Sequence, residues 1–307
     1  MRLVSQSICL LWLAFNLLSS SLAHAAIIVH DSAGSHQFEQ APKRVVVLNW
    51  DLLEQVIALG VTPVGGPELE SYRSWVVNPK APTDITDIGS RSEPNLELIA
   101  KLKPDLILAA SPQQDLLPIL KQIAPVIFLP NFTENENAAE SAIAHFKTIA
   151  KVLDREHQAQ AQLDHIEQRF IELREKLAPY YAPNSDLVVM RFSTLNSIFL
   201  YSDNSSTQYV VSKLGFHNPI QVEPRAWGIK QTRVNTLQKI DDGYVLYVLP
   251  FPQEDKLKDS RLWQALPFVE KGHVNSVRSV WNYGGAMSLL YLAEAITDSL
   301  LELKKTP

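Results

Sequence analysis

The stretch DIGSRSEPNLELIAKLKPDLIL, residues 87–108, contains the alternation that decides the fold class. Apolar residues at helical spacing predict a helix over residues 96–102, and the apolar run at 105–109 predicts a short buried strand. A polar turn, SRSEP, precedes this helix and has Arg91 in its middle. From the residues alone, we interpret this arginine as a solvated loop side chain.

The same alternation continues on both sides of this stretch. On the N-terminal side we predict strands at 44–48 and 61–64 and, between them, a helix at 51–59 that ends at Gly60. On the C-terminal side we predict a helix at 116–123 and a strand at 125–129. Beyond residue 183 the pattern returns, with strands at 187–191, 198–201 and 244–249 and helices at 207–214, 262–265 and 284–303. Such alternation predicts mainly parallel sheets covered by helices.

A long polar segment separates the two runs. Residues 140–177 lack Gly and Pro, and residues 155–177 predict one long helix with charges on all sides. Such a helix either lies solvated on the surface or bridges two lobes. Because each flank has a strand-helix pattern of similar size, we predict an α/β protein of two lobes. The N-terminal lobe would span 26–153, the interdomain helix 154–180 and the C-terminal lobe 181–307.

The first 25 residues have the features of a secretory signal peptide. Arg2 supplies a positive start, residues 8–18 form an apolar run too short to span a bilayer, and Ala23-His24-Ala25 is a cleavage site. We therefore predict a signal peptide at 1–25 and a mature protein exported to the periplasm. The one cysteine, Cys9, lies inside this segment, so the mature chain would have no disulfide and no thiol metal site.

Composition and motifs exclude several classes of function. A formal net charge of −5 without a long Lys/Arg run argues against a nucleic-acid-binding protein. The motifs GxSxG, GxxxxGK[ST], HExxH and GxGxxG are absent. The eight histidines are scattered, and His157 and His165 do not have metal-ligand spacing. We predict no catalytic residue, no cofactor and no protein ligand to a metal, with an exported hydrolase as the alternative.

Tryptophans at strand ends and turns indicate a binding surface. Trp50, Trp75, Trp227 and Trp281 occupy such positions, and Tyr283 lies beside the last of them. Each one alone is more often structural than functional, but four at comparable positions in two lobes are harder to assign to the core alone. Aromatic side chains that face a cleft offer a large and rigid contact area, which suits a bulky, partly apolar ligand.

Three segments resemble the periplasmic ferric hydroxamate siderophore-binding proteins of the ferrichrome-binding type. They are RVVVLNWDLLEQVIALGVTPVG at 44–65, SYRSWVVNPKAPTDITDIGSRSEPNLELIAKLKPDLIL at 71–108, and LWQALPFVEKGHVNSVRSVWNYGGAMS at 262–288. The pattern G-x-x-x-x-P-N-L-E, helix, KPDLI is typical of binding proteins of ABC importers for ferric siderophores, haem and cobalamin. The W and W-x-Y positions are more specific to the hydroxamate branch. The resemblance covers nearly the whole mature chain and implies the class III periplasmic-binding-protein fold, with a shallow cleft between the lobes.

The resemblance also implies a ligand site. Arg91 matches the arginine that hydrogen-bonds the hydroxamate oxygens around iron, and Gln113 stands where the ferrichrome-binding type has a hydrogen-bonding tyrosine. The matches to the aromatic pocket are Trp50, Trp75, Trp227, Trp281 and Tyr283. Iron needs no protein ligand because the siderophore already surrounds it with oxygens, and three hydroxamates neutralise its charge. A catecholate complex has a net negative charge and would need several basic residues, for which the candidates are Arg73, Arg91, Arg225 and Lys230. Catecholate, haem and cobalamin therefore remain alternative ligands.

Transport requires a second surface. In the family an acidic residue on each lobe docks onto an inner-membrane ABC permease, and Glu97 is the N-lobe match, with Glu93 nearby. Both acids also have a simple structural explanation, as favourable charges near a helix N-terminus. In the C-terminal lobe Gln238 or Leu237 falls at the matching position, and Asp241 or Asp242 are possible substitutes. We expect a monomer.

Overall fold

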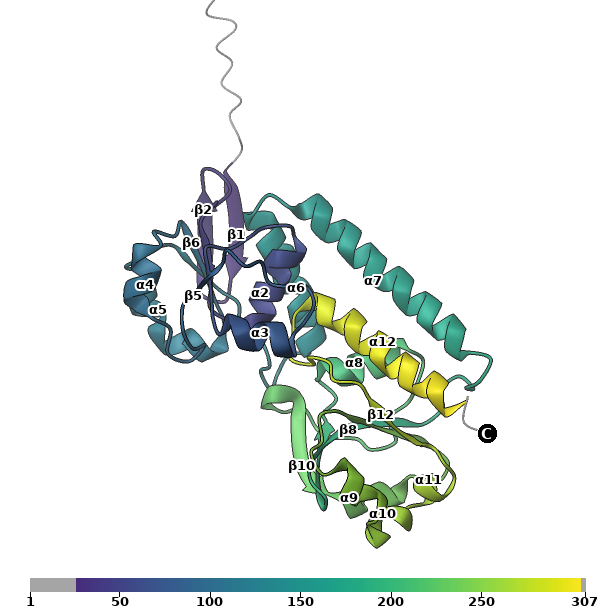
Figure 1. Cartoon of the computed structure of the whole chain (residues 1–307). Coiled ribbons are helices and arrows are strands. Elements are labelled where there is room, and N and C mark those ends of the chain that lie inside the picture. Colours follow the sequence, from purple (N-terminus) through teal and green to yellow (C-terminus); the bar gives the residue numbers. More distant parts are fainter. Residues whose placement is uncertain (1–25, 305–307) are drawn as a thin grey trace, which may run out of the picture.

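The computed structural model describes residues 26–304 and has two α/β lobes joined by a long helix (Figure 1). The predicted signal peptide, with Cys9, lies outside the described residues. A five-stranded sheet forms the centre of each lobe, and a two-stranded hairpin adds to the first. The prediction of a two-lobed α/β fold with a joining helix is confirmed.

The N-terminal lobe contains an all-parallel sheet with the strand order β5-β4-β3-β6-β7. Its strands are β3 (Val45–Val47), β4 (Gly65–Gly66), β5 (Thr86–Asp87), β6 (Leu106–Ala109) and β7 (Val126–Phe128). Strands β3, β6 and β7 are buried and apolar throughout, as expected for a parallel sheet covered on both faces. An antiparallel hairpin of β1 (Ile27–Asp31) and β2 (Gly34–Phe38) precedes the sheet.

Helices follow the strands of this sheet along the chain. They are α2 (Trp50–Ala58), α3 (Leu69–Trp75), α4 (Leu96–Lys101), the 3-10 helix η1 (Ser111–Leu116), α5 (Leu117–Leu120) and α6 (Ala138–Val152). Asn95 caps α4 by accepting a hydrogen bond from the Leu98 amide at 2.9 Å. The cap fixes the point where the turn that contains Arg91 becomes helix.

The C-terminal lobe has a mixed sheet with the strand order β10-β9-β8-β11-β12. Strands β8 (Leu187–Thr194), β11 (Tyr244–Val248) and β12 (Val274–Val277) are parallel, whereas β9 (Ser197–Tyr201) and β10 (Ile229–Arg233) are antiparallel to their neighbours. The remaining elements are α8 (Ser206–Lys213), η2 (Ala226–Gly228), η3 (Val234–Lys239), α9 (Glu254–Lys258), α10 (Arg261–Gln264) and α11 (Pro267–Glu270).

Two helices cross between the lobes. Helix α7 (Glu156–Leu177) leads from the first lobe to the second, and α12 (Ala286–Leu303) lies beside it and also contacts α2 and α6 (Figure 1). Only one face of α7 is buried, through residues such as Phe170, so its other charges remain solvated. Helix α12 is apolar on most of its surface because helices from both lobes cover it.

Some predicted elements differ from the structure. The strand predicted at 61–64 is displaced to Gly65–Gly66, where a Cβ on Gly65 would lie 2.9 Å from side-chain atoms of Ile88 and Leu102. Close packing that only glycine permits therefore decides the position of this strand. The helix predicted at 116–123 begins as the 3-10 helix η1 and continues only as far as Leu120 in α5. The elements that were not predicted are the hairpin β1–β2, strands β5, β10 and β12, helices α3, α6, α9 and α11, and the 3-10 helices η2 and η3.

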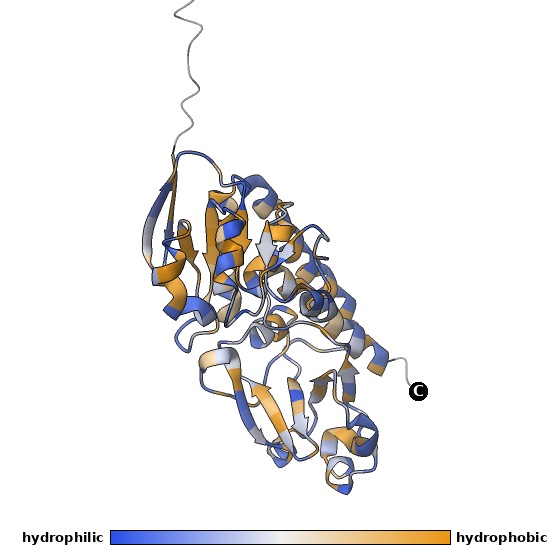
Figure 2. Ribbon diagram, turned by 60° about the vertical axis from the view of Figure 1, so that its left-hand side comes forward, coloured by the Kyte–Doolittle hydropathy of each residue, from blue (hydrophilic) through white to orange (hydrophobic). Residues whose placement is uncertain are grey.

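Hydrophobic residues are concentrated in the strands of the first lobe's sheet, and the helices alternate between hydrophobic and hydrophilic residues (Figure 2). The buried side chains are mainly apolar. One core cluster joins the two lobes through α7 and α12, and each sheet has a further cluster of its own on one face. Within residues 26–304, no helix is long and apolar enough to cross a membrane.

Candidate functional site: an aromatic cavity between the lobes

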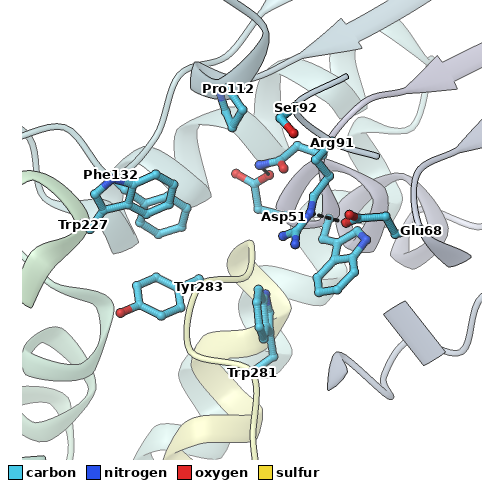
Figure 3. A pocket seen from close by; sticks show the side chains of 11 residues that line it. Asp51, Glu68, Arg91, Ser92, Pro112, Phe132, Trp227, Trp281 and Tyr283 are labelled. Carbon is cyan, nitrogen blue, oxygen red and sulfur yellow. Dashed lines mark hydrogen bonds and ion pairs between the residues drawn. The ribbon is translucent and has the colours of Figure 1, made fainter. Parts of the chain in front are cut away.

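A cavity of about 330 Å³ opens between the two lobes, and we call it the central cavity. It is lined by Asn49, Trp50, Asp51, Glu68, Arg91, Ser92, Pro112, Phe132, Trp227, Trp281 and Tyr283. Figure 3 shows Arg91 and Glu68 on one side, Phe132 and Trp227 on the opposite side, and Trp281 and Tyr283 along the base.

The parallel sheet of the first lobe explains why these residues meet. Each strand contributes lining residues just beyond its carboxyl end: Asn49, Trp50 and Asp51 after β3, Glu68 after β4, Arg91 and Ser92 after β5, Pro112 after β6 and Phe132 after β7. Parallel strands all end at the same edge, so residues far apart in sequence converge there. The C-terminal lobe closes the cavity with Trp227 from η2 and with the loop before α12.

Arg91 is held in position by two contacts. Its Nε donates to Glu68 Oε2 at 2.6 Å, and its guanidinium carbon lies 3.8 Å from the centre of the Trp50 ring (Figure 3). The terminal guanidinium nitrogens have no hydrogen-bond partner among the described residues. The site therefore presents a fixed cation with free donors to the cavity.

The aromatic walls form from both lobes. Trp50 and Trp281 meet edge to face with their centroids 5.1 Å apart, and Tyr283 lies 5.9 Å from Trp281. On the other side Phe132 stacks on Trp227 at 5.7 Å, and the Trp227 amide donates to the Phe132 carbonyl oxygen at 2.9 Å. Both residues of this stacked pair have left-handed backbone angles, with φ of 61° and 64°, a strain that recurs at ligand sites.

A double glycine brings the second lobe's aromatic residues against the first lobe. A Cβ on Gly285 would lie 2.6 Å from the Asp51 carbonyl oxygen, and a Cβ on Gly284 would lie 2.4 Å from Glu54 Oε2. Glu54 on α2 accepts hydrogen bonds from the Gly285 amide and from the amide and hydroxyl of Ser288, at 2.7–3.1 Å. The loop that positions Trp281 is thereby fastened to the helix that begins with Trp50.

Two buried carboxyl groups lie beneath this loop. Burial raises the pKa of Glu54 to about 7, against the hydrogen bonds from Ser288 and Gly285, which favour the ionised form. Burial likewise raises the pKa of Asp51 to about 6. Asp51 Oδ1 accepts from Asn49 Nδ2 at 2.7 Å, whereas Asp51 Oδ2 is buried without a hydrogen-bond partner.

Five of the seven predicted ligand contacts line the central cavity: Trp50, Arg91, Trp227, Trp281 and Tyr283. Trp75 does not, because it is half exposed at the end of α3 and lines a neighbouring cavity on the other side of Trp281. Gln113 does not either, because it is fully buried behind the site. Its Oε1 accepts from the Ala110 amide at 2.9 Å and its Nε2 donates to the Arg91 carbonyl oxygen at 2.5 Å. Gln113 is therefore not placed to contact a ligand in the central cavity. Its hydrogen bonds instead support the backbone of the loop that contains Arg91.

The other basic candidates do not line the central cavity. Arg73 donates to the carbonyl oxygens of Ala81 and Pro82, and neither Arg225 nor Lys230 lines the cavity. Sequence reasoning missed Asp51, Glu68 and Phe132 as lining residues. Their only common signal is a position shortly after a predicted strand, which many loop residues share.

The predicted docking residues divide into two groups. Glu93 and Glu97 are both exposed, Glu93 in the turn that contains Arg91 and Glu97 in the first turn of α4. In the C-terminal lobe Leu237 is fully buried and cannot meet a partner, whereas Gln238 is exposed.

The two acids considered as substitutes lie elsewhere. Asp241 and Asp242 precede β11 at its amino end, where both contact Lys271 Nζ, and the carboxyl end of β11 faces the cleft. They therefore lie at the edge of the sheet opposite to the cleft.

Comparisons with known proteins agree with this architecture. The model of the family described as periplasmic binding protein matches residues 45–280. The iron(3+)-hydroxamate-binding protein FhuD of Escherichia coli is 27% identical over 264 residues, which are 84% of this chain and 87% of that protein. The Fe(3+)-citrate-binding protein YfmC of Bacillus subtilis is 30% identical over 83% of this chain and 79% of its own length.

A solved structure shows a higher identity. It is the Fe3+–Desferal-bound siderophore-binding protein FhuD from Vibrio cholerae, which is 55% identical to this chain. The alignment covers 85% of this chain and 98% of that one, with a TM-score of 0.81.

Proposed function

The chain belongs to the periplasmic binding protein family, and we propose that it captures a ferric hydroxamate siderophore in the central cavity and delivers it to an inner-membrane ABC permease. In this proposal Arg91, Trp50, Trp227, Trp281 and Tyr283 contact the ligand. Glu68 orients Arg91, and Gln113 supports the backbone of its loop.

The charge balance of the central cavity is the observation that favours hydroxamate over catecholate. The cavity has one cation, Arg91, and two carboxyl groups, Asp51 and Glu68, so it offers no excess of positive charge. A ferric trihydroxamate is neutral and needs only donors for its iron-bound oxygens. A ferric catecholate has a net negative charge and would meet repulsion from the two acids, and Arg91 is the only cation among the described residues that line the central cavity.

The aromatic lining suits the body of such a complex. Hydroxamate oxygens gather around the iron, while the chains that connect them are largely apolar. Trp227 is half exposed at the mouth of the cavity and stacks on Phe132, and Trp281 lies at the base. Rigid aromatic faces bind apolar chains at a low cost in side-chain entropy.

The proposal assigns the chain a transport role without catalysis. The related proteins named above bind iron complexes, and the ferric complex is a cargo that needs no resident cofactor. In this proposal the iron is held by siderophore oxygens alone and needs no ligand from the protein. We place the mature protein in the periplasm, after removal of residues 1–25.

A fluorescence titration tests the proposal. Ferric desferrioxamine B and ferrichrome should quench tryptophan emission to saturation at one ligand per chain, because Trp50, Trp227 and Trp281 line the cavity. The iron-free siderophores should quench more weakly. Recovery of the ferric complex unchanged after incubation would separate binding from hydrolysis. Saturable quenching by a ferric catecholate or by haem, with none by any ferric hydroxamate, would refute the ligand class.

A further inference from the structure

A second cavity of about 680 Å³ adjoins the central one, and we call it the side cavity. Trp281 lines both cavities, so the two cavities meet at this ring. The side cavity lies between the end of α3 in the first lobe, at Trp75, and the carboxyl ends of β8 and β11 in the second, at Phe192 and Val248.

Apolar groups form most of the walls of the side cavity. Trp75 and Val77 are exposed to 50% and 52% and stand on the first lobe's side, and Phe192 and Phe199 stand on the other. Large apolar side chains exposed side by side on a soluble domain mark a contact surface. Their place beside the central cavity identifies what they would contact, namely a further part of the same ligand.

One charged side chain, Arg191, lines the side cavity. Its guanidinium lies 5.3 Å from the centre of the Phe199 ring and has no ion pair or hydrogen bond to any side chain that the structure describes. Burial raises the pKa of Tyr283, and the charge of Arg191 acts in the opposite direction. The side cavity therefore has a net positive charge, whereas the central cavity does not.

From this arrangement we infer that the side cavity receives an aliphatic arm of the siderophore that ends in an anionic group, most simply a carboxylate, and that Arg191 pairs with this group. The inference rests on the proposed function and narrows the preferred ligand to hydroxamates with an arm that continues beyond the iron-binding groups. An apolar wall holds the arm, and an unpaired guanidinium offers a planar pair of donors to a carboxylate. An arm that ends in an ammonium group would meet repulsion in the same place.

Three ligands that differ only at the end of the arm test this inference. Ferric desferrioxamine B ends in an amine, its N-acetyl derivative in a neutral amide and its N-succinyl derivative in a carboxylate. We expect the dissociation constant to fall in that order, with the succinyl complex bound on the order of tenfold more tightly than the amine at low salt. Added salt should reduce the difference.

Variants distinguish a direct contact between Arg191 and the ligand from a general effect of the protein's charge. Arg191→Gln should remove the preference among the three ligands, and Arg191→Glu should reverse it. Lys230→Gln is the matched control. Lys230 is an exposed cation on β10, in the same sheet as Arg191, and it lines neither cavity. The control should leave the ranking of the three ligands unchanged.

The outcomes distinguish this inference from the proposed function. Equal affinities of the wild-type protein for the three ferric complexes would overturn the assignment of the side cavity and leave hydroxamate binding intact. An equal effect of Lys230→Gln and Arg191→Gln would overturn the role of Arg191. Failure of all three complexes to bind would overturn the proposed function and this inference together.

Discussion

Replacement of Arg91 by alanine is the most direct test of the site. In the structure Arg91 makes one ion pair, with Glu68, and one cation–π contact, with Trp50, and its terminal nitrogens are free to bind a ligand. The variant would lose the charge-assisted hydrogen bonds to the hydroxamate oxygens, which together are worth on the order of 1.5–3 kcal/mol in a partly desolvated cleft. The dissociation constant for a ferric hydroxamate should therefore increase roughly tenfold to hundredfold.

The same change should affect folding less than binding. The side chains of Arg91 and Glu68 are 33% and 31% exposed, so their ion pair contributes about 0.2–1 kcal/mol. The contact with Trp50 adds about 0.5–1 kcal/mol. The free energy of unfolding should fall by no more than about 2 kcal/mol. Each kcal/mol lost should lower the melting temperature by roughly 2–4 °C.

Three further variants show whether the change in affinity is specific to the guanidinium group of Arg91. Arg91→Lys should recover only part of the affinity, because an ammonium cannot reproduce the planar fork of the guanidinium. Glu68→Gln should lower stability through the lost ion pair but change the affinity much less than Arg91→Ala. Arg73→Ala removes an arginine that is bonded to two backbone carbonyls outside the central cavity, and it should leave the affinity unchanged.

Isothermal titration with ferric desferrioxamine B gives the affinities, and thermal unfolding by circular dichroism gives the stabilities. Wild-type affinity in Arg91→Ala would show that the guanidinium does not contact the ligand. A loss of stability well above 2 kcal/mol would show that Arg91 holds its loop together, so that the weaker binding would be indirect.

Three further predictions concern residues around the site. Gln113→Leu should weaken ligand binding and raise hydrogen exchange in the loop of Arg91, because Gln113 donates to the Arg91 carbonyl oxygen; unchanged exchange would argue against a bracing role. Glu97→Lys should leave the affinity near normal and reduce siderophore uptake by cells, because Glu97 is exposed outside the cavity; normal uptake at normal expression would reject its role in docking. Asp51→Asn should remove a pH-dependent part of the stability, measured by urea unfolding between pH 4 and pH 7. Burial raises the pKa of Asp51 from 3.8 to about 6, so the folded protein keeps a proton that the unfolded chain has released, and the free energy of unfolding falls as pH rises through this interval. The contribution is on the order of 1–3 kcal/mol, and identical pH profiles for the variant and the wild type would contradict it.

Local sequence determined the elements and part of the site. The alternation of apolar strands with periodic helices around residues 87–108 specified the two α/β lobes, because burial on both faces of a parallel sheet leaves a signal in each segment by itself. The tryptophans could be proposed as a binding surface because each lies at a strand end or in a turn, where a parallel sheet presents its ligand-binding edge. Arg91 was assigned to the site only through the family resemblance, because a polar turn by itself predicts a solvated arginine.

The tertiary structure alone decided which of these residues meet. Trp75 and Gln113 stand at equally plausible positions in the sequence, yet one lines the neighbouring cavity and the other is buried with both ends of its amide bonded to backbone. Conversely, Glu68 and Phe132 join the site through contacts with residues 23 and 95 positions away, Arg91 in the first case and Trp227 in the second. Such contacts depend on how strand ends converge and how closely the lobes approach, which Gly284 and Gly285 permit at α2. A local sequence pattern contains no information about the distances between strand ends or between the lobes. Only the folded chain could therefore show which side chains share the cavity.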